Sequence, residues 1–225
     1  MQRLNAEGVE HLILSWTLGG YPCANIAAAA KYFYENCSYD PAKEPTYAAQ
    51  QQFAEAFKEF PFNIMVLYKG PENAGPSTLL FEEPTGYKAT MTCYAYDDLE
   101  SWRSIYPVDV FESQFTKLCE KWEKGLSMLP EQDDTEVTDM AWGTYCLFRS
   151  SLNQIRFVRA RDEGRYAAAA AAAESELEMA HRMLELMNKN AAIGYEAANH
   201  YYFSKGQLAE KILNCHYMIQ AFRGK

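Results

Sequence analysis

The sequence contains no apolar run that approaches the roughly 20 residues needed to span a bilayer. Its first residues also lack the basic region, apolar stretch and small-residue cleavage site of a signal peptide. Acidic residues outnumber Lys and Arg, which gives the chain a formal net charge of −9. An acidic chain repels phosphate groups, so we expect no nucleic acid and no membrane among its partners.

Familiar catalytic and metal-binding signatures are missing as well. The sequence has no G-x-S-x-G, P-loop, H-E-x-x-H or G-x-G-x-x-G motif. Its six cysteines are scattered, without C-x-x-C or close Cys/His spacing, so we expect no metal and no cofactor. Free thiols among apolar helical residues behave as small hydrophobes. Reduced cysteines are therefore expected, which favours a cytoplasmic location.

What the sequence does contain is apolar and aromatic surface. Of its 225 residues, 48% are hydrophobic and 14% are aromatic, with 16 tyrosines. A chain of this length and composition can bury a sizeable core. Tyrosine combines an apolar ring with a hydroxyl group, so it suits half-buried clefts, polyhydroxylated ligands and wet interfaces.

Helical periodicity dominates the C-terminal half. Apolar residues recur three or four positions apart from Val108 to Leu129, and Pro130 ends that predicted helix. Further helices are predicted from the acidic loop 131–136 to about Arg161, from Tyr166 to about Asn188, and after Ser204 as N-cap. We expect these four helices to form an up-and-down bundle with short loops. Earlier helices are predicted over 24–34 and, with Thr46 as N-cap, over 46–60.

The N-terminal part predicts one β-strand. Val9–Trp16 is short, apolar and rich in β-forming residues, and a Gly-Gly-Tyr-Pro turn at 19–22 ends it. A lone strand leaves its backbone groups unpaired, so a partner chain or another domain must supply its neighbours. The predicted fold is thus mainly α, a helical bundle with one N-terminal strand. We divide it into residues 1–60, an aromatic, Pro/Gly-rich coil at 61–106, and the bundle at 107–225.

Two groups of aromatic and acidic residues are candidates for binding. Asp97 and Asp98 precede Trp102, and two acids beside an indole ring resemble a glycosidase subsite, although the acids also suit ordinary helix capping. Trp16 and Tyr21 lie at the carboxyl end of the predicted strand, where α/β proteins bind ligands. They could stack on a sugar, or Trp16 could be a core residue beside a tight turn.

A third candidate lies on the loop before the last predicted helix. Glu196 and His200 could transfer a proton, with Tyr201 beside them as a binding residue. A hydrogen-bonded loop clamp without chemistry explains the same residues.

Three segments carry a resemblance to a known family. Residues 11–22 (HLILSWTLGGYP), 53–107 and 193–215 resemble the C-terminal portion of bacterial glycoside-hydrolase-like proteins, which carry a (β/α)₈ catalytic barrel followed by a helical region. The resemblance implies that the predicted strand is the last barrel strand, with Trp16 and Tyr21 at the catalytic face. It also implies that the main catalytic acids lie on earlier strands, so this chain is a C-terminal fragment.

The leading hypothesis is therefore a carbohydrate-binding accessory region that lacks the main catalytic acids. If the parent is an enzyme, it is a glycoside hydrolase, and this chain alone is not expected to be active. The expected partners are carbohydrate and either an upstream barrel domain or a second copy of the chain. A different hypothesis is a helical interaction or oligomerisation domain without a small ligand. A third is a free-standing hydrolase built on Asp97 and Asp98 or on Glu196 and His200.

Overall fold

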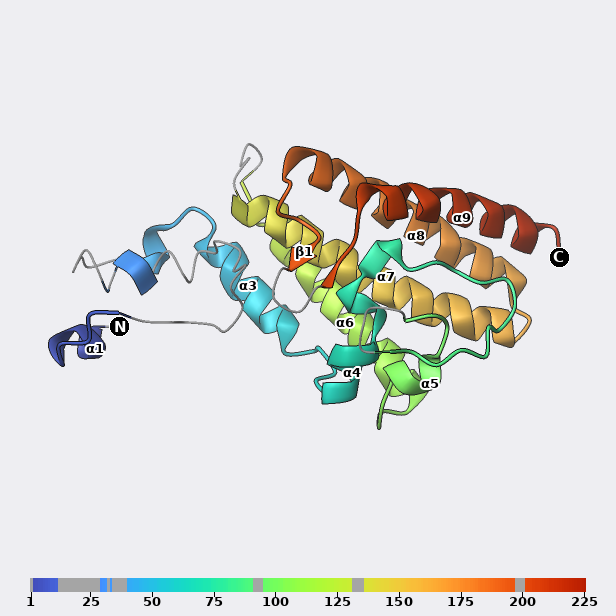
Figure 1. Ribbon diagram of the computed structural model, residues 1–225, viewed down its shortest axis with the longest axis horizontal. Coiled ribbons are helices and arrows are strands. Elements are labelled where there is room, and N and C mark those ends of the chain that lie inside the picture. The colour runs from blue at the N-terminus through green and yellow to red at the C-terminus, as the bar shows by residue number, and fades with distance from the viewer. Residues whose placement is uncertain are drawn as a thin grey trace.

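Helices make up most of the structure. The computed structural model describes residues 2–11, 29–31, 33, 40–90, 95–130, 136–196 and 201–225. Its four long helices are α6 (Val108–Leu126), α7 (Glu136–Asp162), α8 (Tyr166–Lys189) and α9 (Lys205–Arg223) (Figure 1). The prediction of a mainly α, bundled fold is confirmed, and each of the four predicted C-terminal helices is present.

The remaining elements are short. They are α1 (Gln2–Ala6), η1 (Pro41–Lys43), α3 (Tyr47–Phe57), α4 (Ile64–Lys69), η2 (Pro71–Asn73), η3 (Gly75–Ser77), α5 (Leu99–Trp102), β1 (Tyr195–Glu196) and β2 (Tyr201–Tyr202). β1 and β2 pair antiparallel in the connection between α8 and α9. The region predicted as coil, 61–106, thus includes short helical turns at α4, η2, η3 and α5.

Neighbouring long helices in the sequence are neighbours in space. α7 packs against both α6 and α8, α8 packs against α9, and α3 packs on α6 (Figure 1). A turn at 163–165 joins α7 to α8, and Gly164 adopts a φ of +69° there, which favours glycine. This turn is as short as predicted, whereas the connection between α8 and α9 spans 190–204 and contains β1 and β2.

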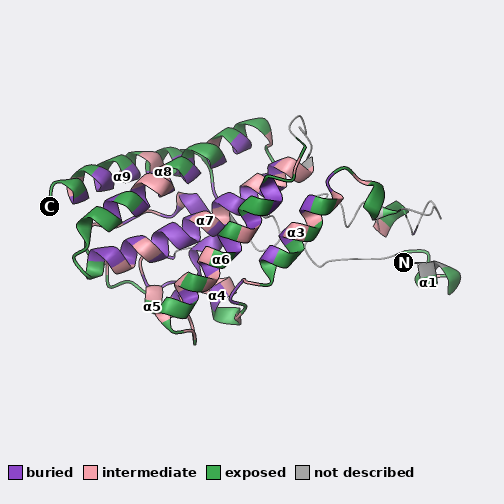
Figure 2. Cartoon of the chain, turned by 180° about the vertical axis from the view of Figure 1, so that it is seen from behind, coloured by how far each residue is buried: buried purple, intermediate pink, exposed green. Residues whose placement is uncertain are grey.

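The predicted apolar stripe of α6 faces the core. Phe111, Phe115, Leu118 and Trp122 are buried, and Figure 2 shows the buried face of the bundle helices turned inward. The Trp122 ring stacks on Phe53 of α3 with the centroids 4.6 Å apart. Each such side chain contributes about 1.5–3 kcal/mol when fully buried, so this stripe fixes how α3 and α7 sit against α6.

The ends of the helices follow local chemistry. Ser204 is confirmed as the N-cap of α9: its Oγ accepts from Gln207 N at 3.2 Å, and Gln207 Oε1 accepts from Ser204 N at 2.7 Å. Thr46 occupies the N-cap position of α3, but its Oγ1 accepts from the Gln50 side chain instead of a backbone N–H. α3 ends at Phe57, earlier than predicted, and 58–60 form a turn before Pro61.

Polar side chains bind the segment 70–81 to the bundle. Asn214 of α9 pairs with the backbone of Leu80, accepting from its N at 2.8 Å and donating to its O at 2.9 Å. Gln154 of α7 donates to Gly75 O at 3.2 Å, and Lys211 of α9 donates to Thr78 O. These bonds give the backbone of this segment polar partners on α7 and α9.

The expected state of the cysteines is confirmed for the described ones. Cys119, Cys146 and Cys215 are free and buried, and burial raises the pKa of each thiol to about 12. The other three, Cys23, Cys37 and Cys93, lie outside the described residues. Buried thiols with such pKa values stay protonated and unreactive.

The predicted N-terminal strand falls mostly outside the described residues. Only 9–11 of Val9–Trp16 are described, and these three residues belong to no strand. Of the predicted helix over 24–34, the described residues 29–31 and 33 are helical. Within the described part of the chain, no helix is both long and apolar enough to cross a membrane.

Candidate functional site

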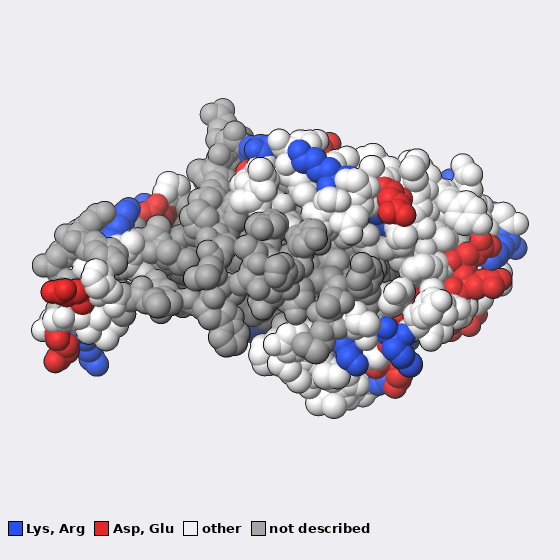
Figure 3. All heavy atoms as spheres, in the orientation of Figure 1, with Lys and Arg blue, Asp and Glu red and all other residues white. Residues whose placement is uncertain are grey.

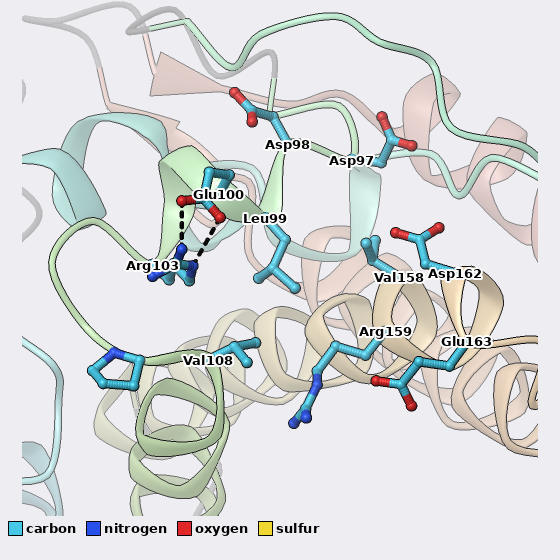
Figure 4. Close-up of a pocket in the computed structure, with 11 residues that line it drawn as sticks. Asp97, Asp98, Leu99, Glu100, Arg103, Val108, Val158, Arg159, Asp162 and Glu163 are labelled. Atoms are coloured by element: carbon cyan, nitrogen blue, oxygen red, sulfur yellow. Dashed lines mark hydrogen bonds and ion pairs between the residues drawn. The ribbon is translucent and has the colours of Figure 1, made fainter.

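An open cleft lies where the turn containing α5 meets the start of α6 and the end of α7 (Figure 4). Its volume is about 630 Å³. The lining consists of five acids, two arginines and four apolar residues: Asp97, Asp98, Glu100, Asp162, Glu163, Arg103, Arg159, Leu99, Pro107, Val108 and Val158. Two of the carboxylates are the pair singled out from the sequence.

Asp97 is a buried structural carboxylate. Its Oδ2 accepts from Arg161 Nη1 at 2.7 Å and from Thr85 N at 3.1 Å, and Oδ1 accepts from Thr85 Oγ1. Burial by itself raises the pKa of Asp97, but the hydrogen bonds from Thr85 and Arg161 outweigh it and hold the pKa below its usual value. Asp97 therefore ties the loop at 85 to the end of α7.

Asp98 fastens the neighbouring stretch of the same loop. Its Oδ2 accepts from Ala89 N at 3.0 Å, and its Oδ1 lies 3.3 Å from Lys88 Nζ. Burial by itself raises the pKa of Asp98. Hydrogen bonds from Ser101, Ala89 and Lys88 together outweigh burial, so the pKa lies below its usual value. Asp98 stands at the N-cap position of α5, yet its side chain makes no capping bond to the helix backbone.

The two carboxylates are poorly suited to acid catalysis. In Figure 4 both point away from Val108 and Arg159, toward the loop that they fasten. A glycosidase needs one carboxylic acid whose pKa is raised so that it stays protonated near neutral pH. Both shifts here are in the opposite direction. The arrangement therefore supports a structural role for both acids, which hold the loop beside the cleft in place.

The remaining charged residues of the cleft form ion pairs. Glu100 Oε2 accepts a hydrogen bond from Arg103 Nε at 3.1 Å, and Figure 4 shows this exposed pair with dashed lines. Asp162, with a side chain 47% exposed, accepts from Arg161 Nε at 2.8 Å. Arg159 is engaged outside the cleft, where it donates to Asp109 at 2.6 Å. Acids outnumber arginines, so the cleft favours hydrogen-bond donors and neutral or cationic ligands.

Trp102 does not line the cleft. Its side chain has no exposed surface, and its indole N–H donates to Ala95 O at 3.0 Å. A ring without an exposed face cannot stack on a sugar, so the predicted binding role of Trp102 does not fit its position in the core. Its contribution is to fix the α5 turn against the bundle.

The other predicted site residues divide into two groups. Trp16, Tyr21 and His200 lie outside the described residues. Glu196 and Tyr201 face each other across the β1–β2 pair, with only their backbone described. The structure thus brings Asp97 and Asp98 to one cleft, and it places Glu196 and Tyr201 in the connection between α8 and α9.

Sequence reasoning missed the partner that holds Asp97. Arg161 is buried and reaches back 64 positions along the chain. Its only sequence signal was its place in the charged end of a predicted helix, where arginine is ordinarily an exposed residue. Thr85, Asp162 and Glu163 gave no signal of their own.

A second acid with unusual electrostatics lies outside the cleft. Glu72 of η2 is buried, and within the described part of the chain neither carboxylate oxygen has a hydrogen-bond partner. Burial raises the pKa of Glu72 to about 8. Its carboxyl packs over Gly70, where even a Cβ would overlap the side chain. Glu72 is therefore protonated at neutral pH.

Charges elsewhere on the described surface are mixed. On the face in Figure 3, Lys and Arg alternate with Asp and Glu over the described residues, without a large basic patch. Among those residues, no group of three or more His, Cys, Asp or Glu side chains is placed to hold a metal ion. Comparison with known protein families, curated proteins and solved structures finds no match to this chain.

Proposed function

We propose that this chain is a carbohydrate-binding accessory region of a glycoside-hydrolase-like protein, and that the cleft at α5 contacts the sugar. The observation that carries the proposal is the cleft itself, in which exposed hydrogen-bonding groups surround an apolar strip. Carboxylates accept hydrogen bonds from sugar hydroxyls, guanidinium groups donate to ring and hydroxyl oxygens, and the partly exposed Leu99 and Val108 offer apolar surface to C–H faces.

The fixed loop beside the cleft also favours binding. Asp97 and Asp98 are each held by several hydrogen bonds, so the loop at 85–89 and the α5 turn are already ordered before a ligand arrives. Pre-ordered groups spare a ligand the entropy of fixing them. The same bonds keep these acids ionised, which supports binding without acid catalysis by this chain.

The proposal also assigns roles to residues of the N-terminal region. We include in it the part of the predicted strand that lies outside the described residues, 12–16, as the last strand of a barrel, with Trp16 and Tyr21 as sugar platforms and the main catalytic acids elsewhere. The proposed location is cytoplasmic, in line with the free thiols of Cys119, Cys146 and Cys215.

Titration calorimetry with a panel of neutral oligosaccharides tests the proposal. We expect saturable binding that Asp162→Asn weakens about tenfold, because a hydrogen bond to a charged group contributes about 1.5–3 kcal/mol. Glu174→Gln is the matched control: this acid also pairs with an arginine and is 43% exposed, but it lies outside the cleft. Absence of binding to every sugar, or equal binding by both variants, would refute the proposal.

A hydrolase assay separates binding from catalysis. The proposal predicts no turnover of chromogenic glycosides by the chain. Turnover that Asp97→Asn or Glu196→Gln abolishes would instead support a free-standing hydrolase.

An apolar surface favours a second candidate, a helical interaction domain. Phe62, Ile64 and Ile105 have exposed fractions of 69%, 57% and 78%. They lie on one corner, because Ser104 Oγ contacts Asn63 Oδ1 at 2.9 Å and Tyr106 donates to Phe62 O at 3.0 Å. Neighbouring exposed apolar side chains are typical of protein interfaces.

Light scattering after size exclusion tests this candidate. A stable dimer that Ile105→Asp dissociates would support it. Leu213→Asp is the control, since Leu213 is 71% exposed on α9. A concentration-independent monomer would contradict self-association through this corner.

A further inference from the structure

A groove runs along α7 between α6 and the first half of α8. Its volume is about 410 Å³. α7 supplies Arg149, Asn153 and Arg156, α6 supplies Glu112, α8 supplies Ala168, Ala171, Ala172 and Ser175, and Arg165 lies at the α7–α8 turn. Three guanidinium groups and one carboxylate line this groove, although the whole chain carries a charge of −9.

The alanines explain why the groove stays open. Ala168 and Ala171 are exposed on α8, and their side chains end at Cβ. Longer side chains at these positions would cover the neighbouring surface of α7. The poly-alanine stretch therefore does two things: its buried members pack closely in the bundle, and its exposed members leave the arginines accessible.

The arginines differ in how firmly they are engaged. Arg156 is held by Glu112, with Nε 3.1 Å from Oε1, and by Thr116 Oγ1 at 3.1 Å. Arg165 pairs with Glu163 at 2.6 Å. Both side chains already have close partners, so they act on the groove mainly through their charge.

Arg149 is the exception. Within the described part of the chain, its polar contacts are Ser175 Oγ at 3.4 Å and Glu123 Oε1 at 3.7 Å, both near the outer limit for such contacts. The same Glu123 oxygen also accepts from the Tyr145 hydroxyl, so that acid is shared. The Arg149 side chain is 27% exposed, and its planar donor fork is available to a bidentate acceptor.

We infer that this groove binds an anionic ligand, with Arg149 and Ser175 gripping one carboxylate or phosphate group and the rest of the ligand lying along the alanine wall toward Arg165. Arg156 is seven residues from Arg149 on the same helix, about 10 Å along its axis, so its charge extends the favourable field in that direction. The inference is independent of the carbohydrate proposal, because the groove and the cleft at α5 share no lining residue.

Calorimetry with two probes tests the site. Tripolyphosphate represents the phosphate source and tri-galacturonate the carboxylate source, both at constant ionic strength, because screening changes any charge contact. We expect saturable binding of at least one probe, and the preferred probe identifies the source. Arg149→Gln should weaken that binding at least tenfold. Arg223→Gln, which removes an arginine that is paired with Glu174 and does not line the groove, should leave it within twofold.

A second variant keeps charge constant. Ala171→Leu fills the groove from an exposed position, so it should weaken binding while the helical circular dichroism and melting temperature stay unchanged. Failure of both probes to bind, or equal losses in Arg149→Gln and Arg223→Gln, would overturn the inference. Binding that Arg149→Gln weakens but Ala171→Leu leaves unchanged would also overturn the proposed path along α8.

Discussion

Lys211 Nζ lies 3.0 Å from Glu176 Oε1 at the interface of α8 and α9, and neither side chain has any exposed surface. Glu176 also accepts from Ser150 Oγ at 2.6 Å and from Asn153 Nδ2 at 3.2 Å, both on α7. Lys211 reaches Thr78 O on the other side. One buried ion pair thus connects three helices and the segment that packs on them.

Removal of one partner should be far more costly than removal of both. Lys211→Met leaves the Glu176 charge buried and unpaired, so we expect a loss of about 3–5 kcal/mol in the free energy of unfolding. Lys211→Met with Glu176→Gln should lose less than Lys211→Met alone, because no charge is left behind. Urea unfolding measures both. The control is Lys58→Met, which removes an exposed i,i+3 ion pair with Glu55. We expect it to change the free energy of unfolding by less than about 1 kcal/mol.

Glu72 should make stability depend on pH in the direction opposite to most acids. The folded pKa of about 8 exceeds the ordinary value of 4.5, so the folded state holds a proton that the unfolded chain loses. Stability is therefore lost as pH rises from 4.5 to 8, by roughly 1.4 kcal/mol per unit of pKa difference. Glu72→Gln should match the wild type near pH 4.5 and exceed it at pH 8. Urea unfolding across this range checks the result, with exposed Glu83→Gln as control; parallel curves for all three would contradict it.

Asp97 should stabilise the fold only when ionised. Its folded pKa is lowered, so its contribution is present above the unfolded value of 3.8 and is lost as pH falls through the folded pKa. Asp97→Asn should cost about 1.5–3 kcal/mol at pH 7, since charged hydrogen bonds to Arg161 and Thr85 weaken.

Hydrogen exchange adds a local readout for the same variant. The amides of 85–90 should exchange faster in Asp97→Asn than in the wild type. Their exchange rates should stay unchanged in Asp40→Asn, the control, because Asp40 is exposed. Unchanged exchange in both variants would show that Asp97 does not anchor the loop.

Two helix glycines should respond to alanine with opposite signs. A Cβ on Gly125 would lie 2.5 Å from Phe53 Cδ1, and that ring is stacked against Trp122. Gly125→Ala should therefore destabilise the protein by about 1–3 kcal/mol despite the better helix propensity. A Cβ on Gly143 would find its nearest neighbour at 3.8 Å, so Gly143→Ala should gain up to about 1 kcal/mol. Thermal and urea unfolding measure the stability of both variants. A gain in stability for both would contradict the prediction, since it would mean that the Phe53 ring moves aside at little cost.

The helical half of the molecule could be predicted from the sequence because its signals are local. The periodic stripe on α6, the Ser204 cap and the glycine at 164 each act within a few residues of themselves. Even the reduced state of Cys119, Cys146 and Cys215 followed from their apolar neighbours. Such features depend on hydrogen bonds and side-chain spacing along a single helix.

The roles of the acids were decided only by the tertiary structure. The sequence placed Asp97, Asp98 and Trp102 together, but it could not tell a catalytic acid from one bonded to Arg161, or a sugar platform from a core ring. Arg161 lies 64 positions from Asp97, and Lys211 lies 133 from Thr78. A carboxylate's pKa, exposure and chemistry depend on neighbours that packing supplies, and those neighbours come from distant helices whose contacts no local pattern encodes.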